Sequence, residues 1–170
     1  MYKVSKGAYI IPSFLLVFLV IFGSSYNSPL YFAEYTPFYE IIIVFYWCFY
    51  LPQVLPLLVL IFFGIFKDYF MMSPMGLSSV SLVLISLLAQ KEASIIKSKS
   101  LAVIFLIFTL NIFIVSIIKI IFLYFSMRVN ISFLLSLFSI RALSTILLYI
   151  PIHFMFGMIR NKVSSQEDGH

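Results

Sequence analysis

Long apolar runs, broken only by short polar segments, constrain this chain more than any motif does. Of its 170 residues, 63% are hydrophobic and 10% are charged, and the mean hydropathy is +1.13. A soluble globular domain is about 45–50% apolar and about 25% charged. Because each membrane span takes ~20 residues, several spans leave no room for a soluble domain. We therefore expect residues 1–170 to form a single integral membrane domain.

The apolar runs predict an all-α, polytopic membrane bundle of about six transmembrane helices. Proline, glycine and basic residues separate the runs, and prolines within the connections end a helix because they lack a backbone donor. A signal peptide is an alternative for the first run, but no A-x-A cleavage site follows it. The expected spans are residues 8–22, 39–51, 55–70, 76–90, 101–125 and 131–158, and a polar cytoplasmic tail follows at 160–170.

Basic residues gather on one side of this expected bundle. Seven lysines and arginines fall on the side of the N-terminus and two on the opposite side. Positive residues are enriched on the cytoplasmic side of membrane proteins, so we expect both termini in the cytoplasm. The charge thus indicates topology and not nucleic-acid binding. The two groups are Lys3, Lys6, Lys91, Lys97, Lys99, Arg160 and Lys162, and opposite them Lys67 and Arg128.

Three charged residues fall within or near the ends of expected spans. Arg141 would lie ~15 Å deep, where a charge is costly and needs a partner or a wet cavity. Asp68 is the candidate partner; the alternative is that Asp68 lies at the outer interface and Arg141 reaches water or lipid phosphate. Lys119 is expected near the outer interface, with its long side chain extended toward water.

Polar residues form two stripes on the last expected span. Small and hydroxyl side chains allow helices to approach closely and to form hydrogen bonds across an interface. Two polar faces on one helix are hard to absorb inside a six-helix bundle, so we expect one to face a cavity or a partner's helix. The first face holds Ser132, Ser136 and Ser139, and the nearly opposite face holds Arg141, Ser144 and Thr145.

The sequence predicts no catalytic, metal or cofactor site. Cys48 is the only cysteine, and the only histidines are His153, expected to snorkel near the cytoplasmic end, and His170. The chain has no Walker loop, no histidine pair at metal-ligand spacing and no supported Ser-His-Asp arrangement. We therefore expect no enzyme activity and no cofactor.

An ordered series of residues between positions 37 and 89 resembles the MreD family of rod shape-determining proteins, small polytopic proteins of bacterial cell-wall elongation. The series includes a G-x-x-x-D pattern and a turn similar to the family's P-L-G-like turn. It departs from the family at Met75, where leucine is usual, and at Gln53, where a basic residue or histidine is common. Its members are Pro37, Tyr46, Trp47, Pro52, Gly64, Asp68, Pro74 and Gly76.

The resemblance implies a fold similar to the membrane S-components of energy-coupling-factor transporters. It also implies a non-catalytic scaffold in the bacterial cytoplasmic (inner) membrane. The expected direct partner is an MreC-like bitopic membrane protein, and the MreB filament, the RodA glycosyltransferase and a class B penicillin-binding protein are indirect partners. Together with Arg141, the residues of the series are the candidate partner-binding or structural positions.

Two other functions remain open. The first is the substrate-binding membrane subunit of a small-molecule transporter, which short helices flanked by proline favour. The second is an enzyme acting on lipid-linked sugar precursors. That enzyme would need a cluster of charged residues facing one leaflet, and the sequence predicts no such cluster.

Overall fold

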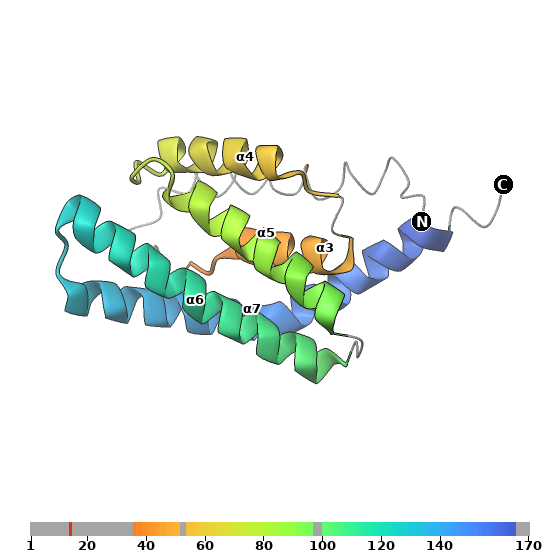
Figure 1. The fold of residues 1–170 in the computed structure, drawn as a ribbon. Helices are drawn as coiled ribbons and strands as arrows, with labels where there is room; N and C mark the ends of the chain where they lie inside the picture. The colour runs from red at the N-terminus through yellow and green to blue at the C-terminus, as the bar shows by residue number, and fades with distance from the viewer. Residues whose placement is uncertain (1–13, 15–35, 52–53, 97–99, 166–170) are drawn as a thin grey trace.

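The structure is a computed structural model that describes residues 14, 36–51, 54–96 and 100–165. Over these residues the chain is all-helical (Figure 1). The expected first span at 8–22 lies, apart from residue 14, outside the described residues, as does the end of the expected tail. The helices are α3 (Tyr39–Tyr50), α4 (Leu57–Phe70), α5 (Leu77–Ile95), α6 (Leu101–Met127) and α7 (Ile131–Ser165).

Three helices begin and end close to the predicted positions, and two extend farther than predicted. The expected spans 39–51, 55–70 and 101–125 correspond to α3, α4 and α6. The prediction for 76–90 was too short, because α5 continues to Ile95 through residues with good helix propensity. The polar tail was also placed too early, since α7 is helical to Ser165. This helix contains Pro151, and its axis changes direction along its length (Figure 1).

Two of the described helices are long enough and apolar enough to cross a membrane. They are α6 and the part of α7 from Ile131 to Ile159. In contrast, α3 has 12 residues and α4 has 14, which correspond to ~18 and ~21 Å. Both lengths fall short of the ~30 Å hydrocarbon core of a bilayer. By length and composition, two of the described helices could span a membrane, and not the predicted six.

Helix α3 lies at the centre of the bundle, although it is the shortest of the described helices. Its residues from Glu40 to Phe49 are all buried. It packs against α5 and α7, while α4 packs against α5, and α6 lies against both α5 and α7. Aromatic rings fill the space around α3: the rings of Phe108 and Tyr149 stack with centroids 4.0 Å apart, and Phe45 packs edge-on against Phe108 at 5.1 Å.

Candidate functional site

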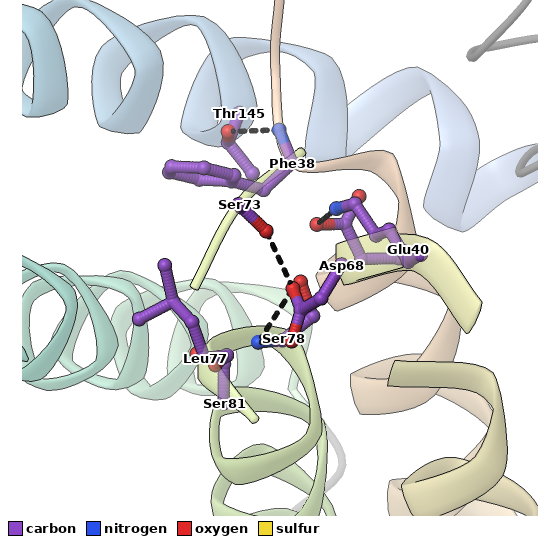
Figure 2. Close-up of polar contacts among 9 residues, drawn as sticks. Phe38, Glu40, Asp68, Ser73, Leu77, Ser78, Ser81 and Thr145 are labelled. Carbon is purple, nitrogen blue, oxygen red and sulfur yellow. Dashed lines mark hydrogen bonds and ion pairs between the residues drawn. The ribbon is translucent and has the colours of Figure 1, made fainter. Parts of the chain in front are cut away.

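The carboxylate of Asp68 closes the turn between α4 and α5. It accepts hydrogen bonds from the Ser73 hydroxyl at 2.9 Å and from the Ser78 backbone N–H at 3.0 and 3.1 Å (Figure 2). It also accepts one from the Gly76 backbone N–H at 2.8 Å. The first N–H groups of a helix have no partner within the helix and attract negative charge. Asp68 is fully buried and caps α5. Its hydrogen bonds therefore come from this turn, and the hypothesis of an Asp68–Arg141 pair was wrong.

Two glycines allow the same turn to form. Gly76, which precedes α5, has φ of 96°, a left-handed conformation that disfavours residues with a Cβ. Gly64 lies one helical turn before Asp68, and a Cβ built on it would lie 2.4 Å from both Cα and N of Ser79. The backbones of α4 and α5 thus touch at Gly64. Pro74 completes the turn, with its carbonyl accepting a hydrogen bond from the Leu77 N–H at 3.3 Å.

An ion pair joins the start of α3 to the end of α4. Lys67 donates a short, charge-assisted hydrogen bond to the Glu40 carboxylate. Both side chains are largely shielded, with exposed fractions of 18% for Lys67 and 11% for Glu40. Glu40 also stands in the first turn of α3, where a negative charge interacts favourably with the helix dipole. The prediction grouped Lys67 with the outer charges and did not identify Glu40 as its partner.

Lys119 points into the bundle and does not extend toward water as predicted. Only 5% of the residue is exposed, and its Nζ lies 4.2 Å from the centroid of the Phe38 ring. The guanidinium carbon of Arg141 lies 5.9 Å from the same centroid. Both cations therefore interact with the π-face of one aromatic side chain, which stabilises a positive charge most where water is excluded.

Phe38 connects these charges to α7. Its backbone N–H donates a hydrogen bond to Thr145 Oγ1 at 2.9 Å (Figure 2). Its ring stacks on Phe138 with centroids 5.9 Å apart. Side chains from four helices meet here, a grouping that the sequence analysis did not predict. We call these residues the charged cluster: Glu40, Lys67, Asp68, Lys119 and Arg141, grouped around Phe38.

A second polar group lies at the other end of α3. His153 Nδ1 is 3.1 Å from the Tyr149 hydroxyl, and its Nε2 is 3.5 Å from the Tyr50 hydroxyl. The residue is 9% exposed, so the prediction that His153 snorkels was wrong. Tyr46 and Trp47 are each 1% exposed and pack near Phe156, so these two residues of the series belong to the core.

The carboxylate of Glu92 and the buried Asn111 form a polar contact that sequence reasoning missed. Asn111 Nδ2 donates a hydrogen bond to Glu92 Oε2 at 2.7 Å, joining the C-terminal end of α5 to α6. Glu92 lies beyond the expected span 76–90. Partial burial raises the pKa of the Glu92 carboxyl above its ordinary value, and the hydrogen bond from Asn111 opposes this effect.

The two polar faces of α7 lie in different environments. Thr145 is buried and Ser144 is half-buried, so this face packs inside the bundle. Ser136 and Ser139 are exposed, and each donates a hydrogen bond to a carbonyl of its own helix, at 2.9 and 2.7 Å. Ser132 is exposed as well and bonds Asn130. The serine face of α7, defined as Ser132, Ser136 and Ser139, thus remains available on the surface.

Of the two remaining predicted positions, Pro37 lies within the described residues and Pro52 does not. Pro37 precedes α3, and its carbonyl accepts a hydrogen bond from Tyr39 N–H at 3.0 Å. Within the described ranges no group of three or more His, Cys, Asp or Glu residues could hold a metal ion. A surface hollow of about 340 Å³ is lined by residues near the end of α6, namely Tyr124, Phe125 and Arg128.

No protein-family profile, no curated protein and no solved structure matches the chain. The function proposed below is therefore based on the residues and their geometry.

Proposed function

We propose that this chain is a non-catalytic membrane scaffold of the MreD type. It binds an MreC-like bitopic protein in the bacterial cytoplasmic membrane. Through that partner it links the MreB filament to the RodA glycosyltransferase and a class B penicillin-binding protein. The proposed architecture is a six-span bundle like that of an energy-coupling-factor S-component, with both termini in the cytoplasm.

The observation that best supports this proposal is the α4–α5 turn. Gly64, Asp68, Pro74 and Gly76, which carry much of the resemblance to MreD, all take part in one structural unit. Gly64 permits contact between the helix backbones, Asp68 caps α5, and Gly76 adopts the left-handed conformation. Each of these roles is structural. A motif that builds a turn is consistent with a scaffold, whereas a catalytic motif would leave reactive groups at an accessible site.

The distribution of apolar surface supports attachment within the membrane. Large apolar side chains stay exposed on the outer faces of α4, α6 and α7, including Phe62 at 67% and Leu147 at 73%. Exposed apolar area of this extent is typical of a surface that meets lipid or a partner. Since short loops and helix faces make up most of the described surface, a partner would bind mainly by helix packing.

The serine face of α7 is the proposed docking surface for the partner's transmembrane helix. Its side chains are small and exposed, and the hydroxyls of Ser136 and Ser139 are already satisfied by their own helix. Another helix can therefore approach closely without leaving a polar group unpaired. The opposite polar face of α7 is occupied by contacts inside the bundle and cannot serve this purpose.

Co-purification in mild detergent tests this function. The chain is expressed with an MreC-like protein, and the retained partner is quantified for the wild type and two double variants. S136L/S139L should lose most of the partner because two leucines separate the helices. S136A/S139A, which keeps the small size, should retain it. If the folded wild type retains no partner, the proposal is wrong; capture of an ATPase subunit instead would support the transporter alternative.

A further inference from the structure

Among the residues that the structure describes, no oxygen acceptor contacts the ammonium group of Lys119. Its described contact is with the Phe38 ring, and neither a hydrogen bond nor an ion pair joins it to another described residue. A lysine ammonium has three donors. A buried charge is costly unless it is paired and hydrogen bonded. Contact with one aromatic ring satisfies only part of this requirement, because a ring offers no lone pair to the three N–H groups.

The two carboxylates of the charged cluster are already engaged elsewhere. Glu40 is in direct contact with Lys67, and Asp68 accepts its hydrogen bonds from the α4–α5 turn. Arg141, on the same Phe38 ring, adds a second positive charge close to Lys119. In the described part of the chain, neither carboxylate therefore forms a hydrogen bond with Lys119, and the charge of its ammonium favours the approach of an anion.

We infer that Lys119, with Arg141 beside it, forms a binding site for a phosphate group. A phosphate oxygen is a strong acceptor for a lysine ammonium, which binds it as a point charge. A phosphodiester with a single negative charge could accept hydrogen bonds from Lys119 while it interacts with the guanidinium of Arg141. This site is distinct from the serine face of α7, and it does not depend on the proposed partner.

The position of Lys119 indicates that a phospholipid headgroup is the natural source of this phosphate. Lys119 lies 18 residues into α6, which places it ~27 Å from the cytoplasmic end of that helix. In the proposed topology this is close to the outer headgroup boundary. Helices α5 and α6 follow one another in the chain, so each starts or ends at the connection between them. Measured from that connection, α5 has 19 residues and α6 has 27, so α6 extends ~12 Å farther than α5. Figure 1 shows the α6–α7 end projecting past the α4–α5 turn. Asp68 of the charged cluster forms its hydrogen bonds with this turn.

Thermal unfolding of the purified full chain in detergent tests the site. The probes are dioleoylphosphatidylglycerol, dioleoylglycerol, which lacks the phosphate, and inorganic phosphate. Wild type is compared with K119Q, with K119R, which keeps the charge, and with K91Q. Lys91 is an exposed residue near the end of α5, so K91Q makes the same chemical change outside the cluster. If K119Q does not fold, K119M replaces it.

Phosphatidylglycerol at tenfold its dissociation constant should raise the Tm of wild type and K91Q by on the order of 3 °C. K119Q should lose this shift, K119R should keep part of it, and dioleoylglycerol should have no effect. An equal, Lys119-dependent shift with inorganic phosphate alone would support the phosphate site and assign it to a soluble ligand. Equal shifts in wild type and K119Q, or no shift in wild type with either phosphate probe, would overturn the inference.

Discussion

The contact between α4 and α5 at Gly64 provides the sharpest test of the structure. A Cβ added at Gly64 would lie 2.4 Å from Cα and N of Ser79 and 2.5 Å from its Oγ. Two of these three atoms belong to the backbone, so a side-chain rotation cannot relieve the clash. In Gly64→Ala the two helices must therefore move apart. That movement also strains the hydrogen bond from Ser79 Oγ to the Ile61 carbonyl, now 3.0 Å long.

The expected cost follows from three contributions. Overpacking a tight contact costs about 1–3 kcal/mol. Loss of the Ser79 hydrogen bond adds about 1 kcal/mol. Against these, alanine is better than glycine within a helix by about 1 kcal/mol. Gly64→Ala should therefore lower the free energy of unfolding by about 1–3 kcal/mol.

Gly157 in α7 supplies the matched control for this substitution. A Cβ there would meet only the Tyr46 hydroxyl oxygen, at 3.9 Å, which is an ordinary contact distance. Gly157→Ala should consequently leave stability unchanged or raise it by up to about 1 kcal/mol. Reversible unfolding of both variants in mixed detergent micelles gives the comparison. If Gly64→Ala is as stable as Gly157→Ala, then α4 and α5 do not touch at Gly64 as described.

Three further predictions concern the charged side chains. Lys67→Met should destabilise the fold by about 3 kcal/mol because it leaves the Glu40 carboxylate shielded from water without its partner. The double variant Glu40→Leu/Lys67→Met should recover most of this loss. Equal losses of stability in the single and double variants would argue against the ion pair. Asp68→Asn should lower the free energy of unfolding by about 1–3 kcal/mol, measured by the same assay, because one acceptor oxygen of the α5 cap is lost; an unchanged value would contradict the cap. Because burial raises the pKa of Glu92 in the folded state, its contribution to stability is greatest below its unfolded pKa of about 4.3 and decreases as the pH rises through the folded pKa. The Tm, measured from about pH 4 to 7, should therefore fall in the wild type but not in Glu92→Gln. Parallel Tm profiles of the two proteins would contradict this prediction.

Helix boundaries followed from the sequence where prolines and glycines mark them. Pro56 precedes α4, Gly76 precedes α5, and the predicted ranges for α3 and α4 were close to those observed. The ends of α5 and α7 were placed too early because polar residues were taken to end a helix. Lys, Glu and Ala are good helix formers, and a polar helix can continue beyond an apolar span.

The environment of the charged residues could not be derived from the sequence. Depth along a helix was used to place Lys119 near water, but depth does not say which way a side chain points. Lys119 turns inward because its side of α6 is buried in the bundle, as Val115 and Ser116 are. The partner of Asp68 was sought on a distant helix, although the nearest orphan N–H groups lay eight and ten residues ahead, at Gly76 and Ser78. A carboxylate shortly before a Pro-Met-Gly turn was the signal that could have revealed the cap.

The segment just before α3 depends on another helix for one of its backbone hydrogen bonds. Phe38 precedes α3 and is buried, and its N–H needs an acceptor because an unpaired buried N–H is costly. Thr145 in α7 provides this acceptor through its hydroxyl, which accepts from Phe38 N–H and donates to the Arg141 carbonyl at 2.6 Å. Thr145→Val keeps the shape and removes the acceptor, so the fold should lose about 1–3 kcal/mol.

Ser144 is the matched control, because its hydroxyl bonds only a carbonyl of its own helix, at 3.0 Å. Ser144→Ala should change the free energy of unfolding by less than about 0.5 kcal/mol. A cost for Thr145→Val no greater than this would mean that Phe38 N–H does not depend on α7. The ring of Phe38 also lies against the Lys119 ammonium. Thr145→Val should therefore also weaken the phosphate-dependent rise in Tm, whereas Ser144→Ala should leave that rise unchanged.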